Sequence, residues 1–148
     1  MARNKKKNLC KRLLTCLTVI KMYKYYNPNP EGRATGDCVI RAISKVTNQD
    51  WEKTYVGVCL QGLLLHDMPD KNYVWSEYLY HKGFRRDVIP NTCPNCYTVS
   101  DFCKDNPTGV FLLAIGDHVV AVDNGDYYDA WDSGNEVPLY LWKRDPRI

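Results

Sequence analysis

The hydrophobic pattern of the chain changes its period once, and this change limits the possible folds more than any other feature. Between Cys38 and His81, apolar residues recur at the three- and four-residue spacing of helices. From Val110 onward, short continuous apolar runs of strand length alternate with turn residues. The pair Asn124-Gly125 between two of these runs is typical of a type I′ hairpin turn. Helices followed by an antiparallel sheet predict the α+β fold class.

Capping and turn residues predict where the individual elements begin and end. Asp37 is a good N-cap for a helix that starts at Asp37 or Cys38, and Thr47 is predicted to cap the next helix. Gly83 is expected to close a third helix, and Thr98 opens a fourth through a capping box. Alternating prolines before Asp37 favour an extended loop. The third helix and the strands are predicted over Tyr73–His81, Phe84–Ile89, Val110–Ile115, His118–Val122, Tyr127–Trp131 and Val137–Trp142.

The basic residues are unevenly distributed along the 148 residues of the chain. Residues 1–24 hold eight Lys and Arg and no acidic residue, so the rest carries a formal charge of −5 within a total of +3. A mildly acidic body is not expected to bind a polyanion. We therefore divide the chain into a basic N-terminal extension, residues 1–22, and one domain, residues 23–148. The extension is expected to be a solvated tail or a helix, with contact to nucleic acid or membrane as the open alternative.

The composition excludes several classes of protein. With 45% hydrophobic and 25% charged residues, the chain can bury a core, which excludes intrinsic disorder. No apolar run approaches the roughly 18 residues that span a bilayer. The seven cysteines are an odd number without the spacing of a secreted disulfide framework. The apolar segment 13–20 is short for a signal peptide, so we expect a cytoplasmic location.

Cys38 is the strongest candidate for a catalytic residue. It follows a glycine-containing loop at the predicted N-terminus of a helix, where free N–H groups and the helix dipole favour the thiolate. His118 begins a predicted strand directly after the Gly116-Asp117 turn. An imidazole can take the thiol proton and later protonate a leaving group near neutral pH. The alternatives are an inert buried thiol and a structural histidine.

A carboxylate that orients His118 is expected on the following strand. The predicted hairpin brings the end of that strand beside the start of the His118 strand, so Asp132 is predicted to contact the imidazole. Asp129 and Asp126 compete for this role on the same strand. Asp129 and Asp132 differ by three positions and should point to opposite faces, so only one of them can face the ring. The neighbouring Trp131 is expected to shield the site from water.

Three segments of the sequence together resemble the compact papain-like cysteine peptidases. They are Gly36–Ile43 (GDCVIRAI), Asp117–Val122 (DHVVAV) and Asp129–Ser133 (DAWDS). Their order, Cys then His then Asp, is that of the superfamily. The short interval between Cys and His is similar to that of the small peptidases that cut double-glycine leader peptides. The resemblance covers roughly residues 25–142 and implies a papain-like fold with N-terminal helices packed on a C-terminal antiparallel sheet.

The resemblance implies a cysteine peptidase that hydrolyses peptide bonds through a triad of Cys38, His118 and Asp132 and a thioester acyl-enzyme. Its substrate would be a peptide or protein, and the chemistry needs no metal or organic cofactor. Small relatives of this kind occur in bacteria and their phages. The alternative functions are a cell-wall amidase or endopeptidase of similar fold, an acyltransferase with the same triad, and a catalytically silent binding module that kept the fold.

The sequence departs from the papain-like pattern at the oxyanion hole. The family usually carries a Gln six residues before the Cys, whereas Gly32 occupies that position here. We expect the amide of Asn27 or Asn29 to replace it, together with the backbone N–H of Cys38. Arg41, one turn into the helix, is expected to be a surface or structural residue.

A second cysteine motif lies at Cys93-Pro94-Asn95-Cys96. A CxxC motif can bind zinc or cycle as a redox pair. Zinc needs four ligands, and Cys103 with His81 or His66 would have to complete the set at a spacing that matches no known zinc ribbon. We therefore expect a Pro-Asn turn with two free thiols and no metal site.

Overall fold

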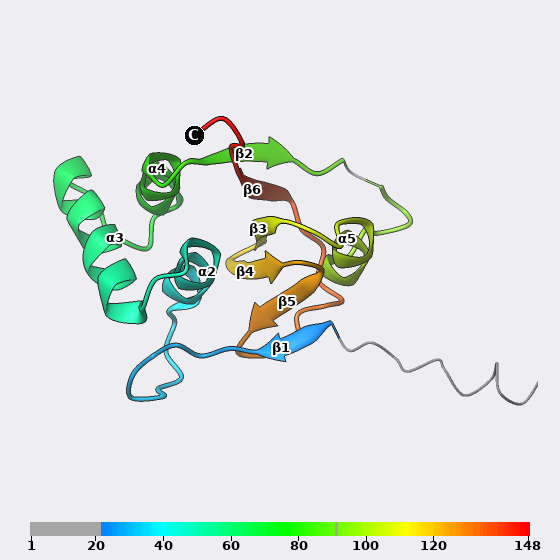
Figure 1. Ribbon diagram of the computed structural model, residues 1–148, viewed down its shortest axis with the longest axis horizontal. Helices are drawn as coiled ribbons and strands as arrows, with labels where there is room; N and C mark the ends of the chain where they lie inside the picture. Colours follow the sequence, from blue (N-terminus) through cyan, green and yellow to red (C-terminus); the bar gives the residue numbers. More distant parts are fainter. Residues whose placement is uncertain (1–21, 91) are drawn as a thin grey trace, which may run out of the picture.

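Six strands form one mixed sheet, which organises the molecule (Figure 1). The computed structural model describes residues 22–90 and 92–148. The strands lie in the order β1-β5-β4-β3-β6-β2, and all neighbours are antiparallel except β1 and β5. Their bounds are β1 Tyr23–Tyr25, β2 Phe84–Val88, β3 Val110–Ile115, β4 His118–Asp123, β5 Asp126–Asp129 and β6 Tyr140–Arg144.

Helices cover both faces of the sheet. Figure 1 shows α2, α3 and α4 on one side and α5 on the other. Strand alternation gives each face its own apolar layer, because Leu112 and Ala121 pack toward α2–α4 while Leu113 and Val120 pack toward α5. The helices span α2 Cys38–Thr47, α3 Trp51–Leu65, α4 Asn72–His81 and α5 Val99–Asp105.

The predicted α+β class is confirmed, but the expected arrangement of the sheet is wrong in two respects. The sheet is mixed rather than antiparallel, because β1 pairs in parallel with β5. It is also not confined to the C-terminal part, since β1 precedes α2, α3, α4 and α5. The short helix α5 adds a layer on the face opposite α2–α4 (Figure 1).

The second predicted N-cap is displaced by three residues. Thr47 ends α2, and its hydroxyl donates back to the Ile43 carbonyl oxygen at 2.6 Å. Asp50 is the actual N-cap of α3, since its Oδ1 accepts from the Lys53 N–H at 2.7 Å. The left-handed conformation of Asn48, with φ of 53°, separates the two helices.

The hairpin that carries the site forms as predicted, but its second strand is shorter than expected. Asn124 and Gly125 both have positive φ, as a type I′ turn requires. The returning strand β5 ends at Asp129 rather than at Trp131, and β6 begins at Tyr140 rather than at Val137. The chain between them turns away from the sheet, which decides the orientation of the carboxylates discussed below.

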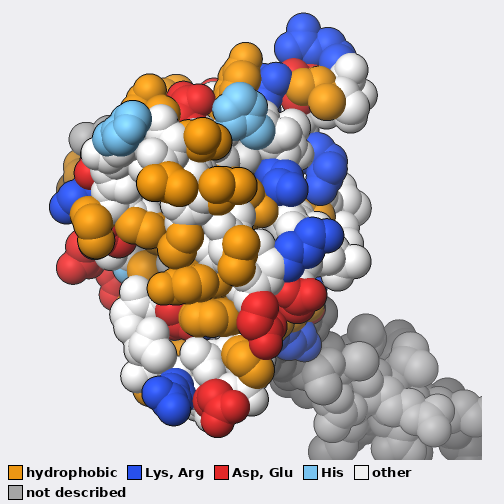
Figure 2. Space-filling view, turned by 90° about the vertical axis from the view of Figure 1, so that its left-hand side faces the viewer, with side chains coloured by type: hydrophobic (Ala, Val, Ile, Leu, Met, Phe, Trp, Pro, Cys, Tyr) orange, Lys and Arg blue, Asp and Glu red, His pale blue; other side chains and the backbone are white. Residues whose placement is uncertain are grey.

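The outer face of α3 is apolar. Val56, Leu60, Leu63 and Leu64 recur at helical spacing and are 53–70% exposed. Figure 2 shows hydrophobic side chains gathered on this side of the molecule.

In the part of the chain that the structure describes, no helix is long and apolar enough to cross a membrane. The expectations for the basic extension lie outside the described residues, apart from Met22.

Candidate active site

The N-terminus of α2 presents Cys38 at its first helical position. Asp37 precedes it as N-cap, but its carboxylate makes no capping hydrogen bond to the helix. That carboxylate instead accepts from the Arg41 guanidinium and from the Trp51 indole N–H, the latter at 2.8 Å. The Asp37 side chain therefore does not occupy the N–H groups in the first turn of α2. These groups lie at the helix end that carries the half-buried Cys38 thiol.

The structure brings Cys38 and His118 together from distant positions in the sequence. His118 is the first residue of β4, and its imidazole lies beside the Cys38 thiol, since both residues line the same two hollows and His118 lowers the pKa of Cys38. The backbone N–H of Val119, the next residue of the strand, contributes to the same lowering of the Cys38 pKa. Cys38 and His118 therefore lie together in one cleft.

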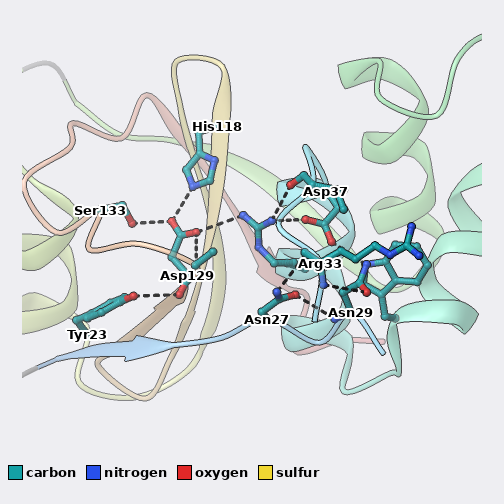
Figure 3. A network of polar contacts seen from close by, with 12 residues as sticks. Tyr23, Asn27, Asn29, Arg33, Asp37, His118, Asp129 and Ser133 are labelled. Carbon is teal, nitrogen blue, oxygen red and sulfur yellow. Dashed lines mark hydrogen bonds and ion pairs between the residues drawn. The ribbon is translucent and has the colours of Figure 1, made fainter. Parts of the chain in front are cut away.

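Asp129, at the end of β5, holds the other side of the imidazole ring. Its Oδ2 lies 2.6 Å from His118 Nε2 and accepts from the Ser133 hydroxyl at 2.8 Å. Its Oδ1 accepts from the Ala130 N–H at 2.7 Å and lies 3.5 Å from an Arg41 nitrogen. Figure 3 shows His118 and Ser133 both directed at this carboxylate. With Nε2 bound to Asp129, Nδ1 is the ring nitrogen left for the thiol.

The prediction that Asp132 contacts His118 is wrong. Its Oδ1 accepts instead from the Tyr127 hydroxyl and, at 3.3 Å, from the Gly134 N–H. The error comes from the end of β5: the strand stops at Asp129, so alternation no longer applies three residues later. The competing candidate Asp129 takes this place, while Asp126, the first residue of β5, faces Lys24 at 3.7 Å.

A buried guanidinium connects the two halves of the site. The sequence left open whether Arg41 is a surface residue or a structural residue. Its side chain is only 8% exposed, so it is not a surface residue. It pairs with Asp37 at the start of its own helix and with Asp129 across on the sheet. Arg41 thereby links the helix that carries the thiol to the strand that carries the imidazole partner. Nothing in the local sequence signals this bridge, because Arg41 and Asp129 are 88 positions apart.

The environment favours a charged thiol–imidazole pair. Burial alone would raise the pKa of Cys38, but the hydrogen bond and charge of His118, the Val119 N–H and the charge of Arg41 outweigh it and lower this pKa. Burial alone would lower the pKa of His118, but the hydrogen bonds to Asp129 and Cys38 raise it to about 9. Between these two pKa values the thiolate and the imidazolium coexist.

The two asparagines predicted for the oxyanion hole are used within their own loop. The Asn27 amide nitrogen donates to the Arg33 carbonyl oxygen at 3.2 Å, and the Asn29 side chain accepts from the N–H groups of Glu31 and Arg33 (Figure 3). Asn27 lines the same hollow as Cys38, whereas Asn29 lines a different one. The amide of Asn29 is therefore not placed to act beside the thiol.

Two hollows meet at the thiol and form a cleft across the site. One, of about 570 Å³, is lined by the loop before α2 and by Trp131; the other, of about 510 Å³, lies toward α4. Both are lined by Gly36, Cys38, Asp117 and His118. The Trp131 ring lies 5.3 Å from the His118 ring between centroids, and this contact fits the predicted shielding role.

The CxxC motif lies away from this cleft. Cys93 and Cys96 are exposed, and they line a separate apolar cavity with Val137 and Leu139. Cys103 lies on α5 and is buried against the sheet, and this burial raises its thiol pKa to about 12. Within residues 22–90 and 92–148, no group of three or more His, Cys, Asp or Glu is placed to hold a metal ion.

Comparisons of the chain with models of protein families, with curated proteins and with solved structures found no match. The functional argument therefore rests on the geometry of Cys38, His118 and Asp129 and on the cleft around them.

Proposed function

We propose that the protein is a cysteine hydrolase of amide bonds, most simply a peptidase, in which Cys38 is the nucleophile. The observation that carries this proposal is that Cys38 and His118 line the same cleft and that the His118 imidazole is hydrogen-bonded to the Asp129 carboxylate. A thiol, an imidazole and an orienting carboxylate are the groups that covalent acyl transfer requires. A papain-like architecture is the fold that best accommodates this proposal.

The reaction would begin from the thiolate–imidazolium pair. The Cys38 sulfur attacks the carbonyl carbon of the substrate, and the carbonyl oxygen becomes an oxyanion near the N-terminus of α2, where the Cys38 N–H is the expected donor. His118 then gives its proton to the amine as the C–N bond breaks, which leaves a thioester on Cys38.

Hydrolysis of the thioester completes the cycle. His118, now neutral, takes a proton from water, and the resulting hydroxide attacks the thioester carbonyl carbon. Collapse of the second tetrahedral intermediate releases the acid and returns the Cys38 thiolate beside the protonated His118. Asp129 keeps the ring orientation through Nε2 and stabilises the imidazolium, without itself accepting the proton.

The proposal is tested by incubating the protein with a peptide library and identifying the new termini by mass spectrometry. We expect cleavage that disappears in Cys38→Ala and persists in Cys59→Ala, the matched control on α3. A rapid acid quench should trap an acyl group on Cys38. A protein that cleaves no peptide and forms no acyl adduct would instead be a binding module with an inactive site.

A further inference from the structure

The hollow on the α4 side of Cys38 is acidic. Among its lining residues are Asp70, from the loop between α3 and α4, and Asp117, from the turn between β3 and β4. Both side chains are exposed. The buried Trp75 and the half-buried Tyr140 form apolar parts of the lining.

These two carboxylates differ from the other aspartates that the structure describes, because neither makes a hydrogen bond or an ion pair. Every other described aspartate has such a partner: Asp37, Asp50, Asp67, Asp87, Asp101, Asp105, Asp123, Asp126, Asp129, Asp132 and Asp145. The two unpaired aspartates therefore line one hollow, directly beside the candidate nucleophile.

Few cations of the chain lie at this hollow: the Arg86 guanidinium stacks on the ring of its lining residue Tyr140, at 3.9 Å from the centroid. Among the described residues that line it, His118 is the only one that can be positive, and none is Lys or Arg. The other hollow, across Cys38, is lined by Arg33 and Arg41 as well as Asp117. Carboxylates on concave, partly apolar walls concentrate a negative potential that attracts cations.

We propose that the α4-side hollow binds the side chain of a substrate lysine or arginine next to the bond that is cleaved. This inference rests on the proposed function, because it assigns a specificity to the same cleft. Asp70 and Asp117 supply the negative charge for the cation, and the half-buried Tyr140 offers apolar lining for the stem of the side chain. The specificity would come from charge, and the aromatic wall would accept either of the two basic side chains.

The first test measures the charge preference of the cleft without requiring turnover. Cys38 is modified in parallel with a cationic trimethylammonium methanethiosulfonate, an anionic sulfonate methanethiosulfonate and neutral iodoacetamide. We expect the cationic reagent to be favoured over the anionic one by roughly ten-fold or more at low salt. This ratio, with each rate divided by the iodoacetamide rate of the same protein, should fall several-fold in the Asp70→Asn/Asp117→Asn double variant.

The matched control is Asp67→Asn, which lies on the same loop as Asp70 but does not line the hollow. It should leave the reagent ratio at the wild-type value. An unchanged ratio in the double variant, or an equal fall in the control, would overturn the inference.

The second test uses peptides that are identical except for Lys, Gln or Glu beside the cleaved bond. We expect kcat/KM to favour the Lys peptide over the Gln peptide, and we expect this ratio to fall several-fold in the double variant. Cleavage without a preference for Lys would overturn the inference and leave the proposed function intact. If the reagent test succeeds but no peptide is cleaved, the hollow prefers cations and the proposed function fails.

Discussion

At the scale of single residues, Asp129 is the residue on which most polar contacts of the site converge, because its carboxylate accepts from three donors. His118, Ser133 and the Ala130 N–H all contact its carboxylate, and Arg41 adds a positive charge at 3.5 Å. A neutral amide cannot satisfy this set of donors, because one of its ends is itself a donor. The carboxylate is therefore required both for charge and for hydrogen bonding.

Asp129→Asn is expected to lower kcat/KM by about 10²–10⁴-fold, since an orienting carboxylate in serine peptidases contributes on this scale. Asp132→Asn should retain most of the activity, because its side chain contacts Tyr127 and Gly134 rather than the imidazole. Steady-state kinetics of the two purified variants measure the difference. Equal losses in both variants would mean that the carboxylate acts through folding rather than through His118.

The activity should depend on pH through the thiolate–imidazolium pair. The pKa of Cys38 is lowered and that of His118 is raised to about 9, so kcat/KM should rise as the thiol ionises and fall as His118 loses its proton near pH 9. In Asp129→Asn the imidazolium loses its anionic partner, so its pKa falls and the basic limb should move to lower pH. A basic limb that stays near pH 9 in this variant would contradict the contact with Asp129.

The candidate site was predictable from the sequence only where a local signal existed. Cys38 was found from the start of a helix and His118 from the start of a strand, and both signals depend on neighbouring residues. Asp132 was chosen instead of Asp129 because the pattern does not reveal where β5 ends. The role of Arg41 depends on a contact across 88 positions, which no local pattern can show.

The helices and strands were likewise predictable where a local sequence signal marks them. Helix α5 has a capping box in which the Thr98 hydroxyl accepts from the Asp101 N–H at 3.2 Å and the Asp101 carboxylate accepts from the Thr98 N–H at 3.2 Å, as the sequence predicted. The β3–β4–β5 meander was also predictable, from its strand-length apolar runs and from Asn124-Gly125. Strand β1 was expected to be an extended loop, because its three residues become a strand only by pairing with β5, which lies about a hundred positions later.

Thr98→Ala should destabilise the fold by about 1 kcal/mol, because it removes the N-cap of α5. Thr98→Ser keeps the hydroxyl and should remain within a few tenths of a kcal/mol of the wild type. Urea denaturation of the two variants measures the difference. Helix α5 packs on the face opposite α2–α4, so the reactivity of Cys38 should be the same in both; a change in Cys38 reactivity would show coupling across the sheet.

At the scale of the whole molecule, the sheet holds the two halves of the site in fixed positions. The Cys38 thiol comes from a helix on one face, and the His118 imidazole and Asp129 carboxylate come from adjacent strands at one end of the sheet (Figures 1 and 3). The buried layer between the helices α2–α4 and the sheet includes Ile43, Leu79 and Ala121. The position of Cys38 relative to His118 therefore depends on the packing of this core.

Leu79→Ala should reduce the free energy of unfolding by about 2–5 kcal/mol, because the side chain is fully buried between α4 and the sheet. Leu64→Ala on the outer face of α3 should change it by no more than about 0.5 kcal/mol, because that side chain is 66% exposed. Chemical denaturation compares the two. A large loss in Leu64→Ala would show that the apolar face of α3 is covered in solution.

The account depends most directly on the state of the Cys38 thiol, which alkylation by iodoacetamide across a range of pH measures, with each cysteine quantified by peptide mass spectrometry. We predict that Cys38 reacts faster than the exposed Cys93 and Cys96 at pH 6, with a midpoint below the value of about 8.5 for a free thiol. In His118→Ala, this midpoint should move upward. The buried Cys103 should react slowest. A Cys38 that is alkylated at the same rate as Cys93 and Cys96, with or without His118, would contradict the assignment of this residue as an activated nucleophile.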